Sequence, residues 1–133
     1  MEVRMCKIKI YLMIYSKLRF FLKFNTTLSS IAIRYAEYGK FPIAVILSYG
    51  GKVKWSKINE FFPFKYIPVG QELNTFSYAI DFFQGKEIDT KPEEILADAW
   101  FLNDYNYKKE FYLHEQNIPM KNYNSVLTIL REA

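Results

Sequence analysis

The chain is poor in the side chains that usually build metal, disulfide and hydrolytic sites. Its 133 residues include one cysteine, Cys6, and one histidine, His114. A single thiol excludes an internal disulfide and fits a reducing compartment. The same scarcity excludes a zinc site made of several Cys and His ligands. No G-x-S-x-G motif accompanies His114, so the sequence predicts no catalytic site, no cofactor and no metal.

Breaks in regular structure are also few, because the chain has only five glycines and five prolines. It contains no internal repeat, which argues against a solenoid. Long hydrophobic runs are missing as well. The uncharged run at residues 10–16 is far too short to span a bilayer.

Apolar and aromatic residues are abundant. Hydrophobic residues make up 50% of the chain and aromatic residues 19%, including 12 Phe and 11 Tyr. That content is far above the range of disordered chains and is ample for a packed core. With this length, it predicts one compact domain with an appended segment.

The net charge of +4 is unevenly distributed along the chain. Residues 1–24 hold six basic side chains against Glu2 alone, whereas the remaining residues hold 12 basic and 13 acidic side chains. The basic character therefore belongs to this N-terminal extension, which contains possible extra strands or a leader. A basic nucleic-acid-binding face on the domain is not expected.

Period-two patterns predict strands near the start of the chain, at residues 7–15, 17–24 and 31–35. Tyr38-Gly39-Lys40 and Gly50-Gly51 are predicted turns. The apolar run at residues 44–48 fits either a strand or a buried helix. Residues 53–60 are predicted to form a short helix, and residues 65–69, which contain Pro68, an edge strand.

Helical spacing dominates the predicted second half. Leu73, Phe76, Ile80 and Phe83 form an amphipathic stripe that ends at Gly85. A capping box at residues 90–93 introduces a helix over 93–102, followed by a helix carrying His114. Residues 120–133 are predicted to form a C-terminal helix. The expected fold class is α+β, a small three-stranded sheet with a C-terminal cluster of helices.

Several of these elements resemble the BTB/POZ domain when taken in order. The resemblance is carried by Gly39-Lys40-Phe41-Pro42, by the stretch from Thr75 to Ile88, and by the helix pattern from Glu93 to Leu102. It covers residues 28–117 and is nearest to divergent members that precede ankyrin repeats in some protist proteins. It implies a non-enzymatic adaptor or self-associating domain in the cytoplasm or nucleus, and it leaves cullin binding open.

An aromatic segment in the middle of the chain supplies the first candidate protein interface. Half of an extended segment must point away from the core, and exposed aromatic clusters mark binding sites. The last predicted helix adds a second apolar stripe that either packs on its own domain or binds a partner. The candidate interface residues are Phe61, Phe62, Phe64, Tyr66, Tyr123 and Leu127.

The remaining polar features are assigned simple structural roles. Glu93, Glu94 and Asp98 complement the dipole of a predicted helix start. Gly50-Gly51-Lys52 lacks the spacing of a phosphate-binding loop and is expected to be a plain turn. His114 is expected at a helix surface or helix end.

The sequence thus predicts a module that binds a protein partner or a second copy of itself. Nucleic acid is not expected as a partner, and a membrane is not the favoured one. The alternative function is a small membrane-associated or secreted protein that uses residues 1–24 as an anchor or signal. Its basic start and short apolar core fit that role, but no small-residue cleavage site follows.

Overall fold

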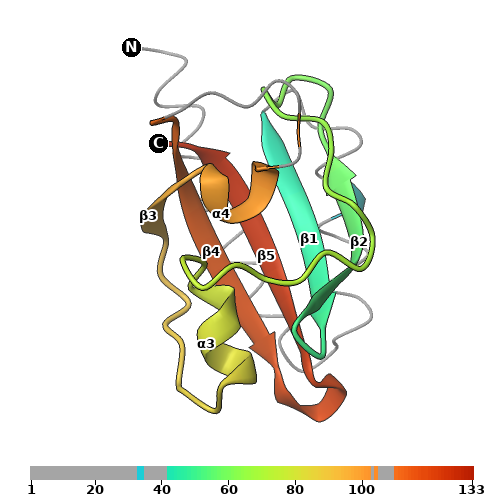
Figure 1. Cartoon of the computed structure of the whole chain (residues 1–133), viewed down its shortest axis with the longest axis vertical. Helices are drawn as coiled ribbons and strands as arrows, with labels where there is room; N and C mark the ends of the chain where they lie inside the picture. The colour runs from blue at the N-terminus through green and yellow to red at the C-terminus, as the bar shows by residue number, and fades with distance from the viewer. Residues whose placement is uncertain (1–32, 35–41, 103, 105–109) are drawn as a thin grey trace.

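The protein folds around one five-stranded antiparallel sheet. A computed structural model describes residues 33–34, 42–102, 104 and 110–133. The strands are β1 (Ile43–Tyr49), β2 (Lys52–Ile58), β3 (Glu93–Leu96), β4 (Tyr112–Met120) and β5 (Ser125–Glu132). Their order across the sheet is β2-β1-β5-β4-β3 (Figure 1).

Two hairpins supply four of the five strands. Gly50 and Gly51, with φ values of 58° and 85°, turn the chain between β1 and β2, as the sequence predicts. Positive φ at both central residues is the geometry of a tight hairpin turn that matches strand twist. The 3-10 turn η1 (Lys121–Tyr123) joins β4 to β5. The last strand lies at the centre of the sheet, between β1 and β4.

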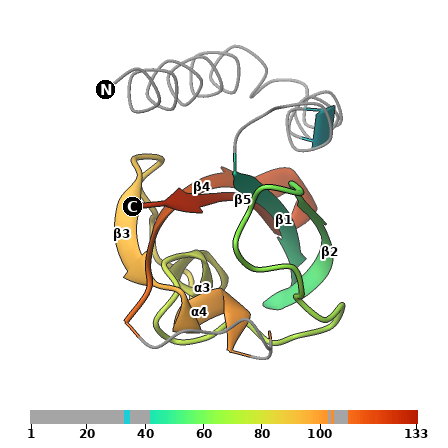
Figure 2. The same cartoon turned by 90° about the horizontal axis from the view of Figure 1, so that it is seen from above.

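The helices α3 (Ala79–Phe83) and α4 (Asp98–Phe101) lie on the same side of the sheet (Figure 2). Figure 2 shows the sheet curving around them, with β2 and β3 at the two sides of the curve. A bulge between Leu47 and Ser48 adds twist to the β1–β2 pair.

Both faces of the central strands are buried, which explains their nearly continuous apolar sequences. In β1, Ile43 through Ser48 are all buried, and in β5, Ser125 through Leu130 are buried. Directly paired residues share a face, so Ala44 and Leu130 belong to the face that α3 and α4 cover.

Aromatic rings fill the space between that face and its cover. Phe64 stacks on Phe101 with ring centroids 4.9 Å apart and meets Phe111 edge-on at 5.1 Å. Phe62 adds a tilted contact with Phe101 at 5.5 Å. Such ring pairs contribute about 0.5–1.5 kcal/mol each beyond the burial of their area. Trp100, from α4, is buried beside them in the same core.

The outer edge of the sheet at β2 is partly covered. Val53 donates its N–H to the carbonyl of Gln71 at 2.9 Å and accepts from the N–H of Gly70 at 2.8 Å. Three lysines of this strand, at positions 52, 54 and 57, are exposed. Pairing and lysines together discourage other chains from adding to this edge.

The predicted fold class is wrong. In residues 42–102 and 110–133, a five-stranded sheet with the short helices α3 and α4 replaces the three-stranded sheet with a helical cluster. Residues 53–58, predicted to be helical together with 59–60, belong to β2, and the predicted edge strand at 65–69 has no regular structure. Ile33 and Arg34, predicted in a strand, have helical backbone. The run at 44–48 belongs to a strand, one of the two predicted alternatives.

The largest errors lie in the second half. The predicted helix over 93–102 is strand β3 followed by α4, and His114 lies on β4. Residues 120–133 hold η1 and β5 in place of the predicted C-terminal helix. The helix before Gly85 exists but is confined to α3, and Gly85 ends it with a φ of 80°. The N-terminal extension and the turn at residues 38–40 lie outside the described residues.

The BTB/POZ resemblance depended on the order of those elements. Glu93–Leu102, its closing helix pattern, is a strand and a short helix, and the three-stranded sheet is not present in the part of the chain that the structure describes. The resemblance therefore carries no further argument about fold or function.

Asn124, which follows η1, offers a test of the β4–β5 hairpin. Its backbone is left-handed, with φ 47° and ψ 43°. An alanine there carries a Cβ that strains this conformation by about 1–2 kcal/mol, whereas glycine adopts it freely. Urea unfolding should show Asn124→Ala less stable by about 1 kcal/mol and Asn124→Gly close to the unchanged protein. Equal losses in both variants would contradict the role of backbone strain.

Candidate functional site

The most concentrated polar site is a carboxylate at the centre of the covered face. Glu115, on β4, is fully buried, and its side chain accepts hydrogen bonds from four groups. Trp100 Nε1 donates at 2.6 Å, Asn117 Nδ2 at 2.5 Å and the backbone N–H of Ala79 at 2.9 Å. Ser77 Oγ lies 3.1 and 3.2 Å from the two carboxylate oxygens.

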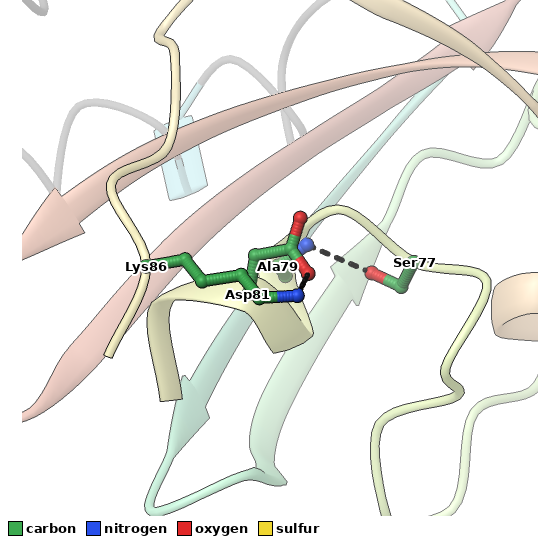
Figure 3. A network of polar contacts seen from close by, with 4 residues as sticks. All are labelled: Ser77, Ala79, Asp81 and Lys86. Carbon is green, nitrogen blue, oxygen red and sulfur yellow. Dashed lines mark hydrogen bonds and ion pairs between the residues drawn. The ribbon is translucent and has the colours of Figure 1, made fainter. Parts of the chain in front are cut away.

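These donors come from three separate segments. Ala79 is the first residue of α3, and its N–H also donates to Ser77 Oγ at 3.1 Å (Figure 3). Together with Glu115, Ser77 therefore fixes the start of the helix. Trp100 belongs to α4. Glu115 therefore ties both helices to the sheet through one side chain.

The network continues across the sheet. Thr128, on β5, donates to Oδ1 of Asn117 at 2.7 Å, which fixes the orientation of the amide and leaves Nδ2 for Glu115. Thr128 and Asn117 are directly paired residues of β5 and β4. Both are buried, and a buried polar network is stable only when its members are satisfied.

Burial raises the pKa of Glu115 above its ordinary value, because removal from water disfavours the charged form. The hydrogen bonds from Asn117, Trp100, Ser77 and Ala79 act in the opposite direction, since they stabilise the carboxylate. Desolvation is the larger effect. Glu115 is a candidate for proton chemistry only if a substrate reaches it, and its fully covered side chain offers no such access. Its position supports a structural role.

The six predicted interface residues divide into two groups. Phe62, Phe64 and Leu127 are buried, with at most 1% of each exposed, so they belong to the interior. Phe61, Tyr66 and Tyr123 are 56%, 54% and 53% exposed. Phe61 and Tyr66 lie in one loop, whereas Tyr123 lies in η1 between β4 and β5.

The loop that carries Phe61 and Tyr66 is held at several points. Asp104 Oδ2 accepts the backbone N–H groups of Lys65 at 2.5 Å and Tyr66 at 2.6 Å. The Lys65 ammonium donates a hydrogen bond to the carbonyl of Asn59 at 3.2 Å and also contacts the carbonyl of Glu60. These bonds bring the two ends of residues 59–66 together, beside the buried rings of this segment.

The predicted helix-start role of Glu93 and Glu94 is wrong because both lie on strand β3, whereas Asp98 does lie in the first turn of α4. His114 pairs across the sheet with Glu94, and its Nε2 lies 4.0 Å from Glu94 Oε2. Burial, and then the charge of Arg131, lower the pKa of His114, while Glu94 raises it. Among the described residues, no group of three or more His, Cys, Asp and Glu side chains is placed to hold a metal.

One pocket lies at the end of α3. It has a volume of about 430 Å³ and is lined by Phe82, Gly85, Lys86, Glu87, Ile88, Pro119 and Lys121. No sequence motif marks it, because its lining comes from a helix end, a loop and the end of β4.

Helices long and apolar enough to cross a membrane are not found in the described part of the chain.

Comparison with known proteins assigns no family. No family model matches the chain, and no curated protein is similar enough in sequence to be treated as a relative.

Glu115→Gln tests whether the buried network stabilises the fold. The amide NH₂ group cannot accept from the donors that face it, so one or more buried N–H groups lose their partner. We expect the free energy of unfolding at neutral pH, measured in urea, to fall by about 2 kcal/mol. The control is Glu93→Gln, the same change at an exposed site on β3. A loss no larger than that of the control would contradict this role.

The raised pKa of Glu115 also predicts a pH dependence. The stabilisation linked to its proton is fully present below the ordinary pKa of 4.5 and is lost as pH rises through the higher pKa of the folded protein. The difference in unfolding free energy between the unchanged protein and Glu115→Gln should therefore be largest near pH 4.5 and decrease as pH rises. Unfolding free energies of both proteins across this range give the measurement. A constant difference would mean that the pKa is not raised.

Proposed function

We propose that this protein is a non-catalytic protein-binding module whose contact surface is centred on Phe61 and Tyr66. The observation that supports this most directly is the division of one short aromatic segment into buried and exposed rings. Phe62 and Phe64 are 1% exposed, whereas Phe61 and Tyr66 are more than half exposed. The buried rings anchor the segment, and the exposed rings face solvent.

Exposed aromatic side chains suit this role energetically. Aromatic residues are enriched at the cores of protein interfaces, where a few anchors supply most of the affinity. A pair of rings on one loop provides a compact anchor, and Glu60 and Lys65 beside them are exposed polar groups of the kind that forms an interface rim.

The restrained loop lowers the cost of binding. Association loses affinity when a partner must order a segment that was free before. Here Asp104 and Lys65 already hold the backbone on both sides of the aromatic rings. A partner therefore meets rings whose backbone positions are set by the fold.

The proposed partner is a protein, either a second copy of this chain or a different protein. Both kinds of interface use exposed apolar rings such as these. A cytoplasmic location suits a chain with a single cysteine, and we propose it on that ground.

Site-specific crosslinking tests the surface with the full chain. A photoreactive phenylalanine analogue placed at position 61 or 66 should give discrete protein adducts in cells, because the rings lie within an interface. Position 76 is the matched control, since Phe76 is 76% exposed on another loop. The same adducts from all three positions, or none from 61 and 66, would contradict the proposal.

Substitution then measures the contribution of the ring. Phe61→Asp should weaken the binding of the crosslinked partner, or dimerisation if the adduct is a second copy, by about tenfold or more. Phe76→Asp should change it by less than about twofold. Sedimentation velocity over a range of concentrations gives the dimer constant, and unchanged urea unfolding shows that both variants remain folded.

A further inference from the structure

The pocket at the end of α3 combines apolar walls with two cations. Phe82, Ile88 and Pro119 provide apolar surface, and Lys86 and Lys121 carry ammonium groups. Its volume of about 430 Å³ falls within the range of small-molecule sites, about 300–1,000 Å³. It lies on segments other than the loop of Phe61 and Tyr66, so it does not depend on the proposed protein-binding surface.

The backbone around the pocket is well defined by hydrogen bonds. Lys86 donates its N–H to the carbonyl of Asp81 at 2.9 Å, and Gly85 donates to Phe82 at 3.2 Å. Gly85 has a φ of 80°, and no atom lies within 4 Å of the position of an added Cβ. The tight turn after α3 therefore sets the position of Lys86 relative to Phe82, and the pocket keeps open space at Gly85.

Both ammonium groups are available to an incoming anion. Lys86 Nζ lies 3.9 Å from Asp81 Oδ1, and both side chains are substantially exposed, at 66% and 37% (Figure 3). Exposed ion pairs of this length are weak, so an anionic ligand competes effectively with Asp81 for Lys86. Lys121 is exposed in the turn after β4.

We propose that this pocket binds a small organic monoanion with an aromatic body. The apolar walls take the ring, and the lysines take the acidic group. An inorganic ion is a poor match because it leaves the apolar walls in contact with water. Glu87 in the lining and Asp81 beside Lys86 both offset the positive charge of the lysines, so a single negative charge fits better than a polyphosphate.

The probe for this class is 1-anilinonaphthalene-8-sulfonate, an aromatic monoanion whose fluorescence rises in apolar sites. Titration of the folded full chain should show saturable binding. The double variant Lys86→Glu and Lys121→Glu replaces attraction by repulsion and should weaken binding by roughly tenfold or more. Lys54→Glu, the same type of substitution at a single lysine of β2, an edge strand of the sheet, should alter binding by less than about twofold.

Two further comparisons separate this pocket from binding of the probe elsewhere on the protein. Phe61→Asp should leave probe binding unchanged, since the exposed aromatic loop is not the site. Benzoate should displace the probe, whereas inorganic phosphate at the same concentration should not. Equal loss in Lys54→Glu, loss in Phe61→Asp, displacement by phosphate alone, or the absence of saturable binding would each overturn the proposal. Near-ultraviolet circular dichroism confirms that each variant retains its tertiary packing.

Discussion

The hydrogen bonds to one buried carboxylate hold the covering layer of this protein onto its sheet. Removing an ionisable group from water is costly, and the cost is offset only when the group is well satisfied. Glu115 meets this condition with donors from Ser77, Ala79, Trp100 and Asn117. Since α3 and α4 are only five and four residues long, intrinsic helix stability cannot position them. Their places depend on this network and on the aromatic core.

Both proposed surfaces follow from that arrangement. The pocket begins where α3 ends, and the start of α3 is fixed by Glu115 through Ala79. The loop of Phe61 and Tyr66 lies over the aromatic cluster to which α4 contributes Phe101. The buried polar network thus lies apart from both proposed surfaces and still determines where their residues lie. Surface changes near Phe61 or Lys121 are expected to leave this interior intact.

Local turn signals could be predicted from the sequence, whereas strand identity often could not. Gly50-Gly51 marked its hairpin because few other residues adopt positive φ. Strand β5 was mistaken for a helix because Val126, Leu127 and Leu130 are buried on two faces, which removes the period-two signal.

The buried carboxylate was missed for a related reason. Every second residue of a strand points to the same face, so Leu113, Glu115 and Asn117 share one face of β4. This pattern becomes informative only once the segment is known to be a strand. The exposed rings at positions 61 and 66 were among the predicted interface residues. The sequence could not separate them from Phe62 and Phe64, because burial of these two rings depends on packing against Phe101 and Phe111, which are distant in the sequence.

The central position of β5 has a consequence for biosynthesis. β1 pairs with β5, so the backbone hydrogen bonds on this side of Ala44 form only after Leu130 has been synthesised. A ribosome releases residues from the N-terminus onward, and during that interval β1 has only β2 as a hairpin partner. An isolated two-stranded hairpin is marginal in water. The sheet therefore closes only after β5 has been translated, and until then the apolar β1 segment lacks one of its two neighbouring strands.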